Sequence, residues 1–351
     1  MVVDELLERA STRAGLNDFG PTGFLEGMER WLEAAQHPPE GFGSPQAFED
    51  LCGKAVNVLV NRLRVIDYAS AHPEVTLQPV ERPIIVLGLP RTGTTLVSYL
   101  LDQDPHLRSL LLWEAFDTVP PATSETLRTD PRALSLLDEQ RSALTRDPSI
   151  ARSHWEWANG PTQCSELHAQ DFKTTYWDRT YPVPEYSEWL EDADLTSTYE
   201  YEQLVLQILQ SAAPGTWSLK NPAHALHLDA LLDVFPDARL VWTHRDPYRA
   251  TASVLAPKSR NWTAKWGTPA LPVLLEYYPR QLGKHVTRPM EVRKEIGEDR
   301  FFDLYYADLM RDPIAELRRL YAWAGEELTP ELLESLFADY LDAYDVEPEP
   351  F

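Results

Sequence analysis

The chain has 351 residues, of which 43% are hydrophobic and 25% are charged, an ordinary balance for a folded protein with a large core. Its formal net charge of −23 argues against nucleic acid or an anionic membrane as the main partner, because a protein that binds polyanions usually presents a basic face. The two cysteines, Cys52 and Cys164, are too few for a disulfide framework. With no signal-peptide pattern and no apolar run long enough to span a membrane, we expect a cytoplasmic protein.

Residues 1–80 contain several segments in which apolar residues recur three and four positions apart. This spacing predicts a helical N-terminal extension packed on a core, and a lid over a substrate pocket is an alternative. From residue 81 onward, short apolar runs alternate with helical segments. We expect strands at 83–89, 107–114, 216–219, 239–243 and 300–305, and helices that include 199–212, a segment opened by Asn221-Pro222, and 312–325.

Strands that alternate with helices predict an α/β fold, here a P-loop-like, doubly wound parallel sheet flanked by helices. We therefore divide the chain into the extension, 1–80, and an α/β domain, 81–351. The domain carries an insertion at about 115–200 that we assign to the substrate pocket. Aromatic residues within 166–194 can line that pocket or form a small core of the insertion. The acidic segment after Gly325 is expected to be helical.

A tight polar loop follows the first strand, at "LPRTGTTL", and opens a helix. It resembles a phosphate-binding loop but lacks the usual lysine. A glycine allows close approach of an anion, the first helical amides favour negative charge, and an arginine supplies a forked cation. The loop therefore predicts a phosphate or sulfate site, with an ordinary strand-to-helix connection as the alternative. Its residues are Arg91, Thr92, Gly93, Thr94 and Thr95.

A second anion site is predicted in "HRDPYRATASVL", residues 244–255. Arg245 ends a strand, and Ser253 lies eight residues later, about one and a half turns into the following helix. The pair can hold a second phosphate. An ion pair between Arg245 and Asp246, with Ser253 as an ordinary helical residue, is the alternative.

Ligands of open parallel sheets bind at the carboxyl ends of the strands. Five polar residues follow the expected strands, namely Arg91, Glu114, Lys220, Arg245 and Tyr306. We expect these residues to converge on one edge of the sheet.

Residues 82–325 resemble a sulfotransferase that uses 3′-phosphoadenosine-5′-phosphosulfate (PAPS), of the bacterial type similar to tyrosylprotein sulfotransferases. The resemblance implies that "LPRTGTTL" binds the 5′-phosphosulfate and that Arg245 and Ser253 bind the 3′-phosphate. It places the catalytic lysine at Lys220 in "SLKNPAH" and a tyrosine near the adenosine at Tyr306 in "YYADLMRDP". It places the catalytic glutamate at Glu114 in "LLLWEAF".

The implied reaction moves a sulfuryl group from PAPS to a hydroxyl, and needs no metal. Glu114 would accept the proton, while Arg91 and Lys220 would stabilise charge on the transferred group and on the leaving oxygen. His168 is an alternative base or a residue of the acceptor pocket, and a structural role is open for it as well. The acceptor is expected to be a small alcohol or phenol, and the aromatic residues favour an apolar one.

The basic, glycine-containing loop that wraps the nucleotide late in this family is not evident after Gly325. Residues 258–260 can cover the nucleotide instead, or the nucleotide is held weakly. Two other functions therefore stay open: a P-loop kinase, and a catalytically impaired protein that binds PAP, the desulfated donor.

Overall fold

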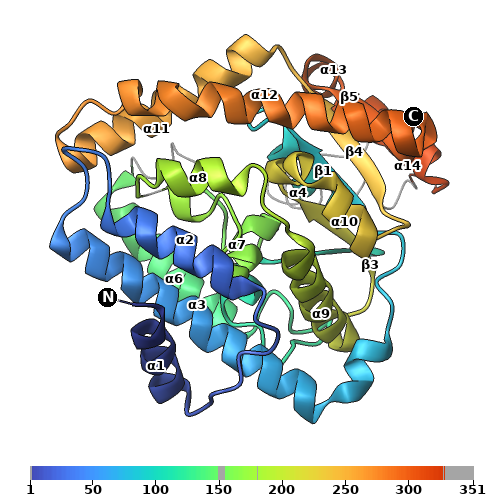
Figure 1. The fold of residues 1–351 in the computed structure, drawn as a ribbon. Helices are drawn as coiled ribbons and strands as arrows, with labels where there is room; N and C mark the ends of the chain where they lie inside the picture. Colours follow the sequence, from blue (N-terminus) through green and yellow to red (C-terminus); the bar gives the residue numbers. More distant parts are fainter. Residues whose placement is uncertain (1, 149–154, 180, 327, 329–351) are drawn as a thin grey trace.

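The structure is a computed structural model that describes residues 2–148, 155–179, 181–326 and 328. Its centre is a five-stranded sheet of order β2-β3-β1-β4-β5 (Figure 1). All neighbouring strands are parallel, as predicted for a doubly wound α/β fold. The strands are β1 (Ile84–Gly88), β2 (Leu107–Ser109), β3 (Thr216–Lys220), β4 (Arg239–His244) and β5 (Phe301–Tyr305).

Helices cover both faces of this sheet. They are α1 (Val3–Ala14), α2 (Phe24–Gln36), α3 (Pro45–Ala71), α4 (Thr94–Leu101), α5 (Leu112–Phe116), α6 (Pro131–Arg146), α7 (Cys164–His168), α8 (Pro184–Leu190), α9 (Thr196–Ala212), α10 (Leu228–Val234), α11 (Pro247–Trp266), α12 (Leu271–Ile296), α13 (Tyr306–Arg311) and α14 (Pro313–Ala324). Short 3₁₀ helices lie at Pro73–Leu77, Ala169–Asp171, Trp177–Arg179, Pro222–Leu226 and Glu298–Arg300. Among the described residues, no helix is both long and apolar enough to cross a membrane.

Strand β1 shows why the sheet is covered on both sides. Its side chains alternate between two hydrophobic clusters, because successive residues of a strand point to opposite faces. Ile85 and Leu87 belong to the cluster that includes residues of α1–α3, α9 and α10. Ile84 and Val86 belong to the cluster formed with α4, α13 and α14. The N-terminal helices thus share a core with the sheet, and the division of the chain at residue 80 stays a prediction.

The expected helix at 199–212 lies within α9, and the one at 312–325 is α14. The Asp312 side chain caps α14 by accepting a hydrogen bond from the amide of Ala315 at 2.9 Å. The helix ends at Gly325, which has a left-handed φ of 77°. The expectation of a helix after Gly325 concerns residues that, apart from 326 and 328, lie outside the described part of the chain.

The expected strand at 107–114 is wrong in its second half. Only Leu107–Ser109 pairs with β3, and Leu112–Phe116 forms the short helix α5. Glu114 explains the change, because its carboxylate accepts a hydrogen bond from the amide of Leu111 at 3.1 Å and so closes a turn at the start of the helix. Glu114 therefore lies in the first turn of a helix and not at the end of a strand.

Candidate active site

The loop between β1 and α4 has a backbone that bends sharply around two residues. Arg91 has φ +70°, which is uncommon for a residue with a side chain, and Gly93 has φ +98°. A Cβ at Gly93 would lie 3.0 Å from Leu309 Cδ2 and 3.2 Å from Tyr306 Cδ2, so only glycine fits without displacing a neighbour. Helix α4 begins directly afterwards at Thr94. The loop thus directs backbone amides and the exposed Arg91 toward the carboxyl edge of the sheet.

The three threonines of the loop differ in position. The Thr92 side chain is buried, donates a hydrogen bond to the Leu89 carbonyl oxygen at 2.6 Å and lies 2.5 Å from the Thr243 hydroxyl. It therefore ties the loop to β4 and does not point outward. Thr94 is buried at the first turn of α4, and Thr95 is half-buried beside it.

Arg245, directly after β4, contacts the loop from the neighbouring strand. Its guanidinium donates a hydrogen bond to the Arg91 carbonyl oxygen at 2.7 Å and lies 4.2 Å from the centre of the Tyr306 ring. Arg91 Nε donates in turn to the Ser253 hydroxyl at 3.2 Å. Three of the five residues expected to converge, Arg91, Arg245 and Tyr306, thus lie together, and Ser253 joins them through Arg91 and not through Arg245 as expected. We call these four residues the cradle.

Both arginines of the cradle keep their charge available. In the part of the chain that the structure describes, neither Arg91 nor Arg245 forms an ion pair with a carboxylate. In a chain with 55 acidic residues and 32 basic ones, two arginines without a carboxylate partner among the described residues can both accept an anionic ligand.

Lys220 is the last residue of β3 and pairs in register with Val86 of the neighbouring strand β1. Its ammonium group is buried and bonds Glu156 Oε1 at 2.8 Å. Burial lowers the pKa of Lys220, and the charge of Glu156 opposes that shift. The other oxygen of Glu156 accepts a hydrogen bond from the Thr162 hydroxyl at 2.6 Å. A cation and a carboxylate therefore share a dry site at the sheet edge.

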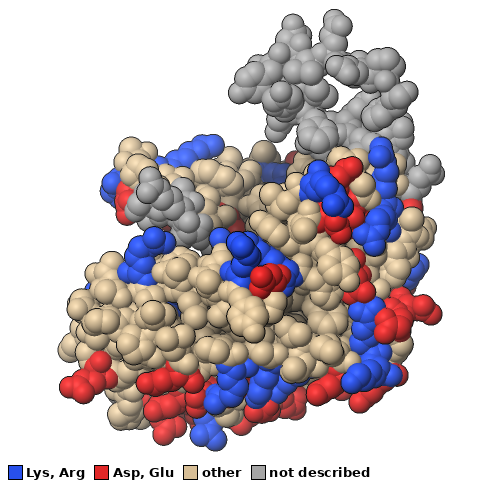
Figure 2. All heavy atoms as spheres, turned by 90° about the horizontal axis from the view of Figure 1, so that it is seen from above, with Lys and Arg blue, Asp and Glu red and all other residues tan. Residues whose placement is uncertain are grey.

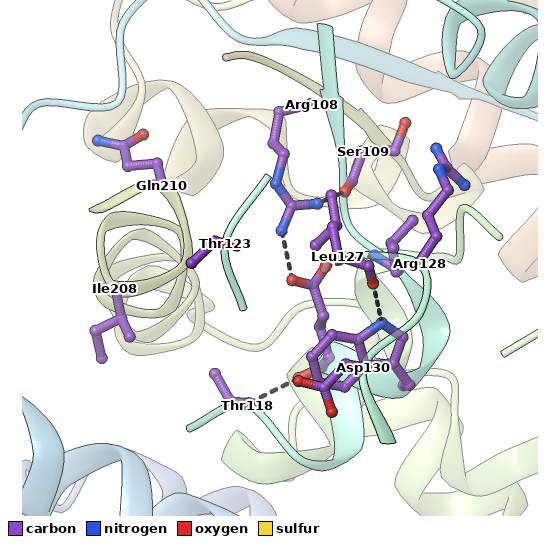
Figure 3. A network of polar contacts seen from close by, with 12 residues as sticks. Arg108, Ser109, Thr118, Thr123, Leu127, Arg128, Asp130, Ile208 and Gln210 are labelled. Atoms are coloured by element: carbon purple, nitrogen blue, oxygen red, sulfur yellow. Dashed lines mark hydrogen bonds and ion pairs between the residues drawn. The ribbon is translucent and has the colours of Figure 1, made fainter. Parts of the chain in front are cut away.

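Glu114 is fully buried and forms hydrogen bonds through both oxygens. Figure 3 labels its partner Arg108 and the neighbouring Ser109. Arg108 of β2 donates to Oε1 in a short ion pair and to the Ser109 carbonyl oxygen, and the Leu111 amide donates to Oε2. The ionic partner of Glu114 is therefore Arg108. A role as proton acceptor requires that the bond with Arg108 open when substrate binds.

His168 is also buried, and its Nε2 lies 2.9 Å from Glu202 Oε2.

The aromatic residues proposed for the acceptor pocket mostly form a core. Trp177, Tyr181 and Tyr186 are at most 2% exposed, and Trp177 stacks on Phe172 with ring centres 5.1 Å apart. Their contacts agree with the alternative of a small core within the insertion.

The suggestion that residues 258–260 cover the nucleotide is wrong for Lys258. This side chain is directed into the protein, where its Nζ donates to Asp178 Oδ2 at 2.8 Å and to the Tyr278 hydroxyl at 2.7 Å. Burial lowers the pKa of Lys258, while Asp178 opposes the shift. Ser259 and Arg260 instead contribute to the wall of a cavity on the surface of α11.

That cavity has a volume of about 650 Å³ and is mainly apolar. It is lined by Ala252, Leu255, Ala256, Ser259, Arg260, Thr263, Ala264 and Leu271. Ser253 of the cradle lies on the same helix, next to Ala252. Figure 2 shows the side of the molecule that carries α11 and α12, where Lys and Arg side chains are interspersed with Asp and Glu along one margin and a further basic group lies near the middle.

Sequence reasoning did not single out Glu156 or Glu166. Glu166 pairs with Arg179 at 2.5 Å, and burial raises the pKa of Glu166. Both carboxylates act electrostatically on Lys220. The sequence near Lys220 does not indicate these interactions, since Glu156 and Glu166 lie 64 and 54 positions away from it. The abundance of aromatic residues in the insertion was the signal that pointed to this region.

A model of the sulfotransferase family matches residues 83–330 of the chain. The fold is similar to that of sulfotransferase STF9 from Mycobacterium avium, with 42% identity, a TM-score of 0.87 and coverage of 100% of this chain and 98% of that chain. Sulfotransferase STF1 from Mycobacterium tuberculosis H37Rv gives 28% identity, a TM-score of 0.84 and coverage of 99% and 96%. A curated relative, omega-hydroxy-beta-dihydromenaquinone-9 sulfotransferase Stf3 of Mycobacterium bovis, is 28% identical over an alignment of 276 positions that covers 74% of this chain and 68% of that protein.

Proposed function

Because this chain belongs to the sulfotransferase family, we propose that it transfers a sulfuryl group from PAPS to the hydroxyl of a small apolar alcohol. The two unpaired arginines of the cradle are the observation that carries the choice of donor. PAPS has an anionic group at each end of its ribose, and the cradle offers one arginine from each of two neighbouring strand ends. The family match also favours sulfuryl transfer over the kinase alternative.

Arg91 and the first amides of α4 would bind the 5′-phosphosulfate, because the start of a helix favours an anion and a guanidinium can donate two parallel hydrogen bonds. Arg245 and Ser253 would bind the 3′-phosphate. The Tyr306 ring, which already packs against Arg245, offers an apolar face to the adenosine.

In the reaction the acceptor oxygen attacks sulfur, the bond between sulfur and the bridging oxygen breaks, and PAP leaves with the electron pair of that bond. The acceptor loses its proton to a base. Lys220 would donate a hydrogen bond to the bridging oxygen as negative charge develops on it. Its burial strengthens this interaction, because few water molecules compete in a dry site.

We retain Glu114 as the predicted proton acceptor, with His168 as the alternative that the sequence offered. Each side chain must first break an existing contact before it can accept a proton. Glu114 must break its bond with Arg108, and His168 its contact with Glu202. The geometry adds Glu156, which already contacts Lys220. Glu114→Gln is expected to keep PAP binding and to lower turnover by about 10²–10⁴-fold, the usual contribution of a general base.

The acceptor class is supported by two observations. The cavity beside Ser253 is mainly apolar and has room for a drug-sized molecule or part of a longer chain. The relative from Mycobacterium bovis is named for a menaquinone-derived alcohol. An apolar alcohol fits both.

The test is a transfer assay with sulfur-labelled PAPS, the purified enzyme and a panel of apolar and polar alcohols, with products identified by mass spectrometry. We expect labelled sulfate esters of apolar alcohols. PAP should bind in calorimetry. Tight PAP binding without any product would contradict the enzymatic role. Full activity of Glu114→Gln, with loss of activity in His168→Gln or Glu156→Gln, would reassign the base.

A further inference from the structure

A cluster of three buried side chains lies beneath Lys220 and takes no part in the reaction proposed above. Cys164 begins α7, Glu202 belongs to α9, and His224 lies in the 3₁₀ helix after β3. Each is at most 1% exposed. One potential ligand atom from each, a sulfur, a carboxylate oxygen and an imidazole nitrogen, lies within 4.8 Å of the other two. Three different types of metal ligand therefore meet at one buried point.

The ligand atoms are oriented by outer hydrogen bonds. The Tyr199 hydroxyl lies 3.0 Å from His224 Nδ1, while His224 Nε2 is buried without a hydrogen-bond partner among the described residues. His168 holds Glu202 Oε2 at 2.9 Å, and the Cys164 thiol interacts with the same carboxylate, whose Oε1 is buried without another hydrogen-bond partner among the described residues. A histidine fixed through one ring nitrogen, with the other left free, is the usual arrangement around a protein-bound metal.

His227, three residues after His224, also has a buried nitrogen without a partner within the described part of the chain, but a water molecule is sufficient to explain it. Its Nε2 is likewise buried and unpartnered among the described residues. It borders a void of about 10 Å³ that is also lined by His168 and Tyr199, which is room for one water molecule. A single water explains His227. It does not explain why a thiol, a carboxylate and an imidazole gather nearby.

We propose that Cys164, Glu202 and His224 bind one divalent transition-metal ion of the zinc type at this buried point. Zinc takes all three ligand types at about 2.0–2.3 Å in tetrahedral geometry, so the ligand atoms must close to roughly 3.5 Å from one another. Water would complete the fourth position. On binding, the Cys164 thiol releases one proton to solvent, and the charges of thiolate and carboxylate balance the 2+ ion.

The site would stabilise the floor of the active site. The Cys164 thiol interacts with the backbone of Lys220, and His224 follows Lys220 by four residues in the same segment. Removing the metal would therefore loosen the segment that positions Lys220, although the metal touches no reacting atom. The proposal does not depend on the identity of donor or acceptor.

The test is metal analysis of the full-length protein purified without chelator. We expect about one equivalent of zinc per chain in the wild type and at least a tenfold lower content in Cys164→Ser. Cys52→Ser is the matched control. Cys52 is also buried and free, but it lies in α3 and has no place in the cluster. This variant should keep the wild-type zinc content.

Two measurements protect the test against a folding defect of Cys164→Ser. Wild-type protein grown with cobalt should show a near-ultraviolet charge-transfer band between thiolate and metal, and Glu202→Gln, which keeps the side-chain shape, should lose it. Wild-type protein that contains less than about a tenth of an equivalent of any transition metal and shows no cobalt band holds an ordered water only. That result, or equal zinc in wild type and Cys164→Ser, overturns the proposal.

Discussion

The cradle and the region around Lys220 both contain cations at one edge of the sheet, but these cations differ in exposure and in pairing with carboxylates. In the cradle, Arg91 and Arg245 are partly or fully exposed and have no carboxylate partner among the described residues. Around Lys220 the cations are paired. Lys220 bonds Glu156 and Arg108 bonds Glu114, and no side chain of these two pairs is more than 5% exposed.

The two regions differ in the source of the anion that neutralises their cations, which is a ligand in the cradle and a protein carboxylate around Lys220. A charge can stay unpaired where water solvates it, and it then gains its partner when an anionic ligand binds. A buried charge without a partner costs several kcal/mol, so the protein supplies the partner itself. The cradle is therefore prepared for a ligand, whereas the buried pairs hold the shape of the site before any ligand arrives.

The largest effect is expected when the cradle loses both cations. Arg91→Ala/Arg245→Ala should weaken PAP binding by about 10³–10⁴-fold, because each hydrogen bond to a charged group contributes roughly 1.5–3 kcal/mol. Isothermal titration calorimetry measures this. Arg249→Ala is the control, since Arg249 lies in α11 close to Arg245 in sequence and its side chain is 81% exposed. Unchanged PAP binding in the double variant would mean that the cradle is structural.

The Arg108–Glu114 pair tests the buried side of the comparison. The two side chains are 4% and 0% exposed. Arg108→Met should lower the free energy of unfolding by about 3–5 kcal/mol, because it leaves a buried carboxylate without its partner. Urea denaturation is the measurement. Arg141→Met removes an exposed pair with Asp138 and should change stability by less than about 0.5 kcal/mol. Equal effects would remove the distinction between buried and exposed cations.

Lys220 combines both properties, since it is paired in the free enzyme and is proposed to act in turnover. Lys220→Met should lower kcat by about 10²–10³-fold, as the loss of a group that stabilises developing charge does, with PAP affinity nearly unchanged. It should also destabilise the fold by leaving Glu156 unpaired. The double variant Lys220→Met/Glu156→Gln should recover stability without turnover. Recovery of turnover as well would assign Lys220 a purely structural role.

The smallest effect concerns His285, a buried histidine that forms no ion pair among the described residues. Burial lowers the pKa of His285 from 6.5 to about 4, so the folded protein keeps this ring neutral. Between these pH values the unfolded chain binds more protons, and stability must fall as the pH drops from 6.5 toward 4. The loss is at most about 3 kcal/mol.

Urea denaturation at pH 4.5–7 measures this slope. His285→Asn keeps an N–H for the Gln281 carbonyl oxygen, which lies 2.9 Å from His285 Nδ1, and should flatten the slope. His37→Asn is the control, because His37 makes the same contact with Glu33 at 3.0 Å but is exposed. An equal slope in His285→Asn and wild type would show that His285 does not carry the effect.

The sheet and the cradle could be predicted from the sequence because their signals are local. An apolar strand, a glycine-containing loop and a helix start stand together, and topology then brings adjacent strand ends to one edge. The buried pairs depend on tertiary packing and carry no local signal. Arg108 and Glu114 are close in sequence, but their pairing could not be predicted because Glu114 lies in helix α5 and not in the expected strand. Glu156 meets Lys220 only after 64 residues of chain have folded.

The hydrogen bond from Arg245 to the Arg91 carbonyl oxygen has a consequence for order within the cradle. A guanidinium has five N–H donors in a fixed plane, and this contact uses one. Arg245 can therefore fasten the unusual backbone turn at Arg91 and still offer its remaining donors to a ligand. Because the turn is already ordered in the free protein, ligand binding costs less conformational entropy than it would with a disordered turn.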